Sequence, residues 1–265
     1  MCVLSSFWLD NLLGRRWPVH KYPVCDEWDS PNHGTKERAP VSAIQTTGLT
    51  KILQGRVVLR DVCLQVAEAD CVAITGANGS GKTTLLRCLC GAIRPTSGSI
   101  QWYGHQSRMS AKVRRLIGYV AHEQQVYPHL TVRENLVFAA RMSEVLNPLR
   151  RADELLETTG LAGVSDQLAT RISRGMRQRL AIARAIVHDP QIILLDEPFT
   201  GLDSQGCDWL AQLINELCQR GRTVCFATHQ LEWTRRLARR VFRVRAGDVH
   251  DFSPETNYFA GQPAA

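Results

Sequence analysis

The stretch Gly76-Ala77-Asn78-Gly79-Ser80-Gly81-Lys82-Thr83 decides how the rest of this sequence is interpreted. It matches the phosphate-binding pattern G-x-x-x-x-G-K-[ST] at every fixed position. Residues 71–75, which precede it, form a short apolar run rich in β-branched side chains and predict a buried strand. Residues 84–89, which follow it, have helical periodicity. The sequence therefore predicts a strand, a glycine loop and a helix N-terminus in succession.

This succession suits the binding of a phosphate chain. The glycines let backbone N–H groups turn inward, and the helix dipole favours negative charge at the same place. We expect Lys82 to reach the β- and γ-phosphates and the Thr83 hydroxyl to ligate Mg²⁺. The alternative, a glycine turn that merely precedes a lysine, is disfavoured by both flanking elements. The predicted nucleotide-binding residues of this stretch are Gly76, Ala77, Asn78, Gly79, Ser80, Gly81, Lys82, Thr83 and Thr84.

Two carboxylates follow a second apolar strand, which we predict at residues 191–195. Asp196, at the end of this strand, can hold Mg²⁺ through water beside Thr83. Glu197 is one residue further along, so its side chain points differently and can polarise the water that attacks the γ-phosphate. Acidic pairs after strands are common, but the phosphate loop upstream favours the metal and base roles.

A second candidate anion site precedes a helix that we predict at residues 177–187. Ser173 and Gly175 lie at its start, where a serine and a glycine suit an N-terminal cap. Alone, this pattern would indicate an ordinary cap. Its position between the phosphate loop and Asp196 favours a contact to the nucleotide instead.

Three further motifs give a resemblance to the nucleotide-binding subunit of an ATP-binding cassette (ABC) transporter, from about residue 44 to residue 249. Residues 173–179 resemble the family's signature, whose usual form is Leu-Ser-Gly-Gly-Gln. Gly201-Leu202-Asp203 resembles the D-loop, and Thr228-His229 resembles the switch histidine that contacts the γ-phosphate. The order of all these motifs along the chain makes the match highly specific.

The resemblance implies a fold, cofactors and a working assembly. The fold is α/β, with a P-loop NTPase (RecA-like) core, an antiparallel β subdomain and an inserted helical signature subdomain. ATP and Mg²⁺ are the implied cofactors of an ATPase, and Glu197 and His229 are the implied catalytic residues. Ser173, Gly175 and Asp203 of one subunit would contact ATP held by the phosphate loop of another. The working unit would therefore be a homodimer or heterodimer of ATPase subunits.

Four positions depart from the family pattern. Arg174 and Met176 replace a glycine and the glutamine of the signature, and Arg174 adds a donor and a positive charge. Leu53 stands about where the family places an aromatic that stacks on adenine, so we expect apolar nucleotide contact without stacking and looser base selectivity. His122 stands where the family's Q-loop glutamine serves the metal, and its charge would vary near neutral pH.

The segment around His122 gives a finer resemblance. Tyr119-Val120-Ala121-His122, with residues 134–136, 196–203 and 228–230, resembles the haem-exporter ATPase of cytochrome c biogenesis. Related export cassettes share parts of this pattern. The resemblance implies a subunit that drives export, whereas the cargo, the direction and the membrane partner are properties of other subunits.

The sequence argues against a membrane-spanning chain, and the resemblance implies one that lies beside a membrane. The sequence has 265 residues, of which 44% are apolar, and a formal net charge of +7. No run of 18 apolar residues occurs, so separate transmembrane permease subunits would form the pore. We expect a peripheral subunit at the cytoplasmic face of the membrane. The arginines between residues 235 and 245 lack an aromatic stacking pattern and indicate a solvated face, so no nucleic acid partner is expected.

The nine cysteines show no paired C-x-x-C spacing, and their odd number argues against a disulfide framework. We therefore expect a reducing compartment. Five of them lie in apolar, periodic contexts that predict small buried side chains. These are Cys63, Cys71, Cys88, Cys90 and Cys225.

The chain divides into three parts. Residues 1–40 carry tryptophans and prolines without a period, which predicts a poorly ordered extension or, alternatively, a wrongly chosen start codon. Residues 41–252 are the predicted ABC nucleotide-binding domain, and residues 253–265 are a short C-terminal tail. Strands alternate with helices in the domain, so the central sheet should be largely parallel. Further strands are predicted at 44–49, 57–66, 98–103, 116–120 and 223–228, a hairpin at 241–249, and helices at 133–142, 152–159, 209–220 and 231–239.

Two other functions compete with a transport ATPase. A non-transport cassette protein, acting on another protein or a nucleic-acid complex, usually carries two cassettes or a long coiled coil, and neither pattern occurs in this sequence. A small-molecule kinase or a GTPase would not need the signature or His229, and no Asn-Lys-x-Asp guanine motif occurs. A catalytically weakened cassette is disfavoured because the lysine, both carboxylates and the histidine are intact.

Overall fold

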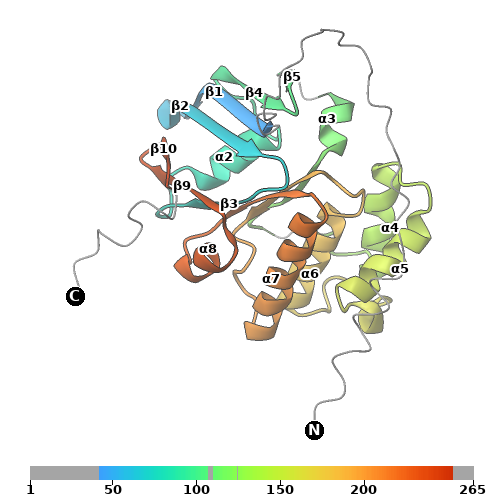
Figure 1. Ribbon diagram of the computed structural model, residues 1–265. Helices are drawn as coiled ribbons and strands as arrows, with labels where there is room; N and C mark the ends of the chain where they lie inside the picture. The colour runs from blue at the N-terminus through green and yellow to red at the C-terminus, as the bar shows by residue number, and fades with distance from the viewer. Residues whose placement is uncertain (1–41, 107–109, 124, 253–265) are drawn as a thin grey trace, which may run out of the picture. The chain divides into compact units, whose positions relative to one another are not determined.

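The computed structural model describes residues 42–106, 110–123 and 125–252 (Figure 1). The predicted extension at residues 1–40 and the predicted tail at residues 253–265 lie outside the described residues. Both therefore stay predictions, and the described residues make up the predicted nucleotide-binding domain.

A six-stranded sheet forms the centre of this domain, in the order β10-β9-β3-β8-β7-β6. Its strands are β3 (Cys71–Thr75), β6 (Ile117–Val120), β7 (Ile192–Asp196), β8 (Thr223–Ala227), β9 (Arg240–Arg245) and β10 (Asp248–Asp251). All neighbouring pairs are parallel except β9 and β10, which form the predicted hairpin. Ala246 and Gly247 turn this hairpin with positive φ values of 49° and 90°. The predicted α/β fold with a largely parallel central sheet is confirmed.

Side chains alternate along each strand and separate two hydrophobic layers. Ile193 and Leu195 of β7 belong to the layer on one face of the sheet, and Ile192 and Leu194 belong to the layer on the other face. Helices α6 (Arg174–Ala185), α7 (Ser204–Gln219) and α8 (Leu231–Leu237) contribute to the first layer, and α2 (Lys82–Leu89) and a second sheet contribute to the other.

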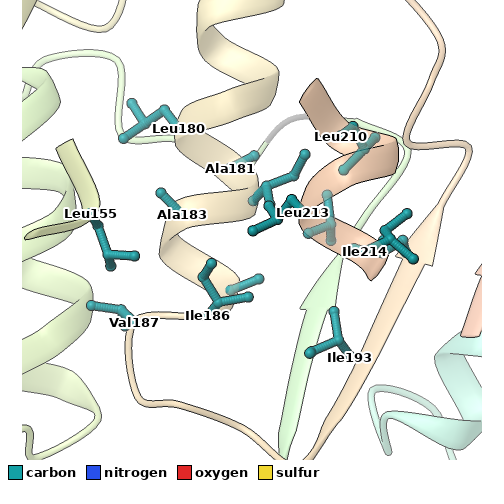
Figure 2. Packing of buried hydrophobic residues seen from close by; sticks show 14 of the residues in the cluster. Leu155, Leu180, Ala181, Ala183, Ile186, Val187, Ile193, Leu210, Leu213 and Ile214 are labelled. Atoms are coloured by element: carbon teal, nitrogen blue, oxygen red, sulfur yellow. The ribbon is translucent and has the colours of Figure 1, made fainter. Parts of the chain in front are cut away.

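Figure 2 shows the first layer from close by, with α6 and α7 side by side. Buried side chains from α6, from the residue that caps its C-terminus, Ile186, and from α7 and β7 meet there: Leu180, Ala181, Ile186, Leu210, Leu213, Ile214 and Ile193. Full burial of one large aliphatic side chain contributes roughly 1.5–3 kcal/mol. The layer therefore holds α6 and α7 against the strand that ends at Asp196, and so defines where the acidic pair lies.

The second sheet is antiparallel, in the order β2-β1-β4-β5. Strands β1 (Ser42–Leu53) and β2 (Arg56–Ala67) form the predicted hairpin and are longer than predicted, β4 (Ser97–Trp102) lies one residue from its predicted place, and β5 (His105–Gln106) was not predicted. Trp102 joins this sheet to α2, because its Nε1 donates a hydrogen bond to Leu89 O at 2.9 Å. The antiparallel β subdomain is confirmed.

A helical segment lies between β6 and β7 in the sequence. It consists of α4 (Val132–Met142), α5 (Pro148–Thr158), the single turn η1 (Ala162–Val164) and α6, and the short α3 (Ala111–Arg115) precedes β6. Helix α4 begins with a capping box, in which Thr131 Oγ1 accepts from Glu134 N and the Glu134 carboxylate accepts from Thr131 N. The predicted helical subdomain is confirmed, while α3 and η1 were missed because single turns carry too little periodicity.

Three helices begin three or more residues earlier than the sequence predicts. Helix α5 begins at Pro148 instead of residue 152, because the fixed φ of proline suits the first turn of a helix. Helix α6 begins at Arg174 instead of residue 177, and α7 begins at Ser204 instead of residue 209. The reason is that Ser173 and Asp203 cap their first turns with side-chain oxygens. Within the described part of the chain, no helix has both the length and the apolar character that a membrane span requires.

The cysteine predictions hold in part. Cys71, Cys88 and Cys225 are buried, as predicted, and Cys90 is half-buried. Cys63 is exposed, because it points away from the core-facing neighbours that flank it on β2. The prediction of burial was therefore wrong for Cys63.

Candidate nucleotide-binding site

The loop between β3 and α2 adopts a backbone that requires glycine at two places. Gly76 has φ 150° and Gly81 has φ 116°. A Cβ on Gly76 would lie 2.3 Å from Val244 O, and one on Gly81 would lie 2.9 Å from Val58 O. Neighbouring backbone thus excludes larger residues, and the loop leads directly into the N-terminus of α2, where helix N–H groups favour an anion.

A pocket of about 320 Å³ adjoins this helix N-terminus. Six predicted residues of the phosphate loop and α2 line it: Asn78, Gly79, Gly81, Lys82, Thr83 and Thr84. Three predicted residues from elsewhere in the chain, His122, Glu197 and His229, line it as well. Val58 and Thr200 complete the lining, and neither was predicted. The fold therefore gathers most of the predicted site around one pocket.

The Lys82 side chain is buried, with 6% of its surface exposed. Its Nζ donates hydrogen bonds to Gly76 O at 2.9 Å and to Ala77 O at 3.2 Å, and it lies 3.7 Å from Glu197 Oε1. A buried ammonium group requires such partners. They keep a positive charge beside the phosphate loop, where a lysine can contact the β- and γ-phosphates.

Glu197 lies between Lys82 and His229. Its Oε1 faces the lysine, and its Oε2 lies 3.0 Å from His229 Nδ1. The Glu197 backbone has φ 49°, and this left-handed conformation costs a non-glycine residue roughly 1–3 kcal/mol. Its N–H donates to Ala227 O at 3.0 Å, so the end of β8 helps to hold the strained backbone. The carboxylate consequently has a defined position in the pocket.

Asp196 is fully buried at the end of β7, and the Thr83 hydroxyl donates to its Oδ1 at 3.2 Å. Burial raises the pKa of Asp196, while the Thr83 hydrogen bond and the charge of His122 act in the opposite direction. Its Oδ2 has no hydrogen-bond partner among the described residues. A carboxylate oxygen beside a threonine hydroxyl fits Mg²⁺, which completes its shell with phosphate oxygens and water. The described ranges contain no group of three or more His, Cys, Asp and Glu side chains placed to hold a metal ion, so phosphate and water would supply most of the ligands here.

Leu53 does not line the pocket. It ends β1, is 40% exposed and pairs with Arg56 across the β1–β2 hairpin. Val58 of β2 lines the pocket instead, so it is nearer to the site than the residue predicted to contact adenine. No local pattern distinguishes Val58 from Leu53, because the register of the paired strands shifts. Thr200 could have been found by its closeness to the acidic pair in the sequence.

Ser173, Gly175 and Asp203 also lie outside the pocket lining. Ser173 Oγ accepts a hydrogen bond from Met176 N at 3.2 Å, and Asp203 Oδ1 accepts one from Gly206 N at 2.8 Å. Within a single chain, both side chains thus serve as helix caps. The structure brings the phosphate loop, His122, Glu197 and His229 together, and it leaves the signature and D-loop residues apart from them.

Comparison with known proteins agrees with this fold and site. A family model described as ABC transporter matches residues 59–200, which is more than half of the chain. The chain therefore belongs to the ABC transporter family.

Relatives in this family serve different transport systems. The sulfate/thiosulfate import ATP-binding protein CysA 1 of Agrobacterium fabrum is 36% identical over 214 residues, covering 78% of this chain and 62% of that protein. The lipopolysaccharide export system ATP-binding protein LptB of Haemophilus influenzae is 34% identical over 215 residues, covering 79% and 89%. The chain spans about two thirds of the length of most such relatives, for example 66% and 69% for proteins of Bacillus subtilis and Bacillus licheniformis.

Solved structures agree as well. The dimeric, post-hydrolysis state of the ATP-binding cassette MJ0796, bound to ADP and Pi, has a TM-score of 0.73 and 28% identity over 79% of this chain and 98% of that one. The fold and the site together define an ABC-type ATPase.

Proposed function

We propose that this chain is the ATP-binding and ATP-hydrolysing subunit of an ABC transporter, and that separate transmembrane permease subunits form the transport pathway. The observation that carries the proposal is the convergence of Lys82, Glu197 and His229 beside the phosphate loop. A pocket that only bound a nucleotide would not need a carboxylate held between a lysine and a histidine.

The residues of the pocket divide the reaction between them. Lys82 and the N–H groups of the phosphate loop bind the β- and γ-phosphates and neutralise their charge. Thr83 and Asp196 would hold Mg²⁺, which supplies further charge neutralisation when bound. Glu197 accepts the proton of the attacking water, and His229 orients Glu197 through Nδ1 and contacts the γ-phosphate.

A second ATPase subunit completes the site in this proposal. Ser173, Gly175 and Asp203 lie outside the pocket of their own chain and at the N-termini of two helices, where an anion is favoured. We propose that they contact ATP bound to a second subunit, in a homodimer or a heterodimer. The dimeric form of the related cassette MJ0796 supports this arrangement.

The finer assignment is a peripheral subunit at the cytoplasmic face of the membrane that drives export of the haem-export type. It rests on the motif resemblance around His122, because the relatives are named for both import and export systems. Deleting the gene and measuring covalently bound haem in c-type cytochromes tests it. Loss of that haem supports the assignment, and unchanged haem content contradicts it.

The arginine-rich stretch does not favour a nucleic-acid partner. Arg236 pairs with Asp208 at 2.7 Å, and Arg240 pairs with Asp251. Arg236 also lies over the Trp233 ring, 5.2 Å from its centroid. These side chains are engaged in local pairs of the kind expected on a solvated face, so a nucleic-acid-directed ATPase remains the weaker alternative.

Fractionation and turnover test the transport role together. An epitope-tagged chain should sediment with membranes, be released by a wash that removes peripheral proteins, and hydrolyse Mg-ATP faster when its membrane partner is present. A chain found only in the soluble fraction, with turnover that membranes do not change, would contradict the transport role and leave the ATPase assignment in place.

A further inference from the structure

The first turn of α6 lies against the segment that follows Glu197. A Cβ on Gly201, where φ is 82°, would lie 2.5 Å from Arg174 Nε and 2.9 Å from its Cζ. The Arg174 side chain therefore rests on the Gly201 backbone, in space that a larger residue would fill. The usual signature has a glycine in place of Arg174 and hence no side chain that could make this contact.

A second contact from the same helix reaches the same segment. Gln178 lies four residues after Arg174, on the same face of α6, and is buried. Its Nε2 donates to Pro198 O at 3.2 Å. The N-terminal half of α6 thus contacts residues 198–202 at two points, through Arg174 and Gln178.

This segment joins two parts of the candidate site. Glu197 begins it with a strained backbone, and Asp203 ends it as the cap of α7. Within it, Thr200 N donates to Glu197 O at 3.2 Å and Leu202 N donates to Phe199 O at 3.3 Å. The segment is a short run of turns, so the Thr200–Glu197 hydrogen bond is a route by which a displacement at Gly201 can reach Glu197.

We propose that Arg174 is a positioning residue, which couples the signature turn of α6 to the loop that carries Glu197. The inference rests on the proposed ATPase function of the same site. Arg174 acts through Gly201 and does not contact the nucleotide. When the signature turn binds ATP on a second subunit, α6 shifts, and the contact between Arg174 and Gly201 changes the position of the Glu197 carboxylate in the same chain.

Two substitutions remove this contact from opposite sides. Arg174→Ala deletes the side chain, and Gly201→Ala displaces it, because the guanidinium end can move. Gly221→Ala is the matched control, since Gly221 has φ 78° and an added Cβ would meet no atom within 4 Å. It therefore carries the same backbone strain and displaces nothing. Arg174→Lys keeps the charge and loses the planar guanidinium, so it separates contact from charge.

The turnover experiment compares these variants with saturating Mg-ATP. We expect Arg174→Ala, Arg174→Lys and Gly201→Ala each to lower kcat about tenfold, because a 1 Å misplacement can cost up to about 100-fold. The Kd for ATP should match that of the wild type in every variant. The Tm of Gly201→Ala should match that of Gly221→Ala, and the Tm of the two Arg174 variants should match that of the wild type. The Arg174→Ala/Gly201→Ala double variant should be no slower than the slower single variant, since both changes remove one contact. Losses that multiply in the double variant, or full turnover in Arg174→Lys, would overturn the proposal.

Amide hydrogen exchange of the nucleotide-free chain separates this proposal from the ATPase function. The amides of Thr200 and Leu202 should exchange faster in Arg174→Ala and Gly201→Ala than in Gly221→Ala. Unchanged exchange overturns the coupling even in an active ATPase. Faster exchange in a chain without any ATP turnover supports the coupling and contradicts the proposed function.

Discussion

The phosphate loop and the signature turn are both predicted to bind ATP, yet the chain builds them differently. Around the phosphate loop, the Glu197 carboxylate lies 3.7 Å from Lys82 and 3.0 Å from His229. At the signature turn and the D-loop, Ser173 and Asp203 each accept a hydrogen bond from their own helix. The first region is connected across the fold, and the second consists of two separately capped helix N-termini.

The difference separates the residues that hydrolyse ATP from those that regulate when hydrolysis occurs. Buried charges need partners from the same chain, so Lys82 and Glu197 hold each other in place, and the half-exposed His229 adds a contact to the Glu197 carboxylate. A capped helix N-terminus is already stable alone and still favours an anion that approaches from outside. We infer that the catalytic groups are preassembled in each chain, and that closure by a second subunit decides when they act.

Lys82→Ala has the largest expected effect on ATP binding and turnover, and it tests the catalytic region formed by the phosphate loop, Glu197 and His229. We expect both ATP binding and turnover to be lost, because the buried positive charge beside the phosphates disappears while the glycines remain. Calorimetric titration with Mg-ATP and phosphate release measure the two quantities. Lys112→Ala, which changes an exposed lysine of α3, is the control. Wild-type turnover in Lys82→Ala would contradict the role of the loop.

Glu197→Gln separates chemistry from binding in the same region. Glutamine keeps the shape of the side chain and loses the basicity, so turnover should fall about 10²–10⁴-fold, as is typical when a general base is removed. ATP affinity should stay close to that of the wild type, because Lys82, Thr83 and the loop hold the phosphates. Single-turnover kinetics measure the fall, and near-normal turnover would show that Glu197 is not the base.

His122→Gln introduces the residue that is usual in the family at this position of the nucleotide pocket. His122 lines the pocket on the segment that joins β6 to α4, so it can link the metal site to a membrane partner. We expect ATP affinity to change little and the stimulation of turnover by the permease to change severalfold. A large loss of affinity with unchanged stimulation would contradict this assignment.

The smallest expected effect is a change in the pH dependence of stability, and it concerns His188. This histidine connects α6 to β7, and its Nε2 lies 3.2 Å from Ile117 O. Burial lowers the pKa of His188 from its ordinary value of 6.5, although the Ile117 hydrogen bond opposes the shift. The unfolded chain therefore binds the proton more readily, so the contribution of His188 to stability is present above pH 6.5 and is lost as the pH falls below it.

Thermal unfolding between pH 7.5 and about 5.5 measures this effect. His188→Gln should flatten the fall of Tm on acidification, because glutamine can donate to Ile117 O without titrating. His250→Gln, at an exposed position of β10, is the matched control and should leave the slope unchanged. Equal slopes for wild type and His188→Gln would contradict the assignment.

The phosphate loop and the acidic strand end could be predicted from the sequence because their chemistry depends on local order. The glycines, Lys82 and Thr83 must follow one another at fixed spacing, and Asp196 must end a buried strand. The start of α7 carried a signal that was overlooked. Asp203 is a good N-cap residue and therefore predicts a helix from residue 204, in addition to its match to the D-loop.

Other features depend on packing and could not be predicted from a single sequence. Leu53 and Val58 lie on paired strands whose register shifts at several points, so spacing along the chain does not identify which of them lines the pocket. The contact of Arg174 with Gly201 likewise exists only because α6 packs against the layer beside β7. Such contacts join residues that no local pattern relates.

The central claim is that the phosphate loop of one chain and the signature turn of a second chain bind the same ATP. The mass of Glu197→Gln in solution, measured with and without Mg-ATP, tests this claim most directly. The account predicts the mass of two chains in Mg-ATP and of one chain without nucleotide. Adding Ser173→Arg to Glu197→Gln should leave ATP affinity unchanged and keep the chains single. A Glu197→Gln chain that binds ATP and stays single, or a dimer that forms despite Ser173→Arg, would contradict the account.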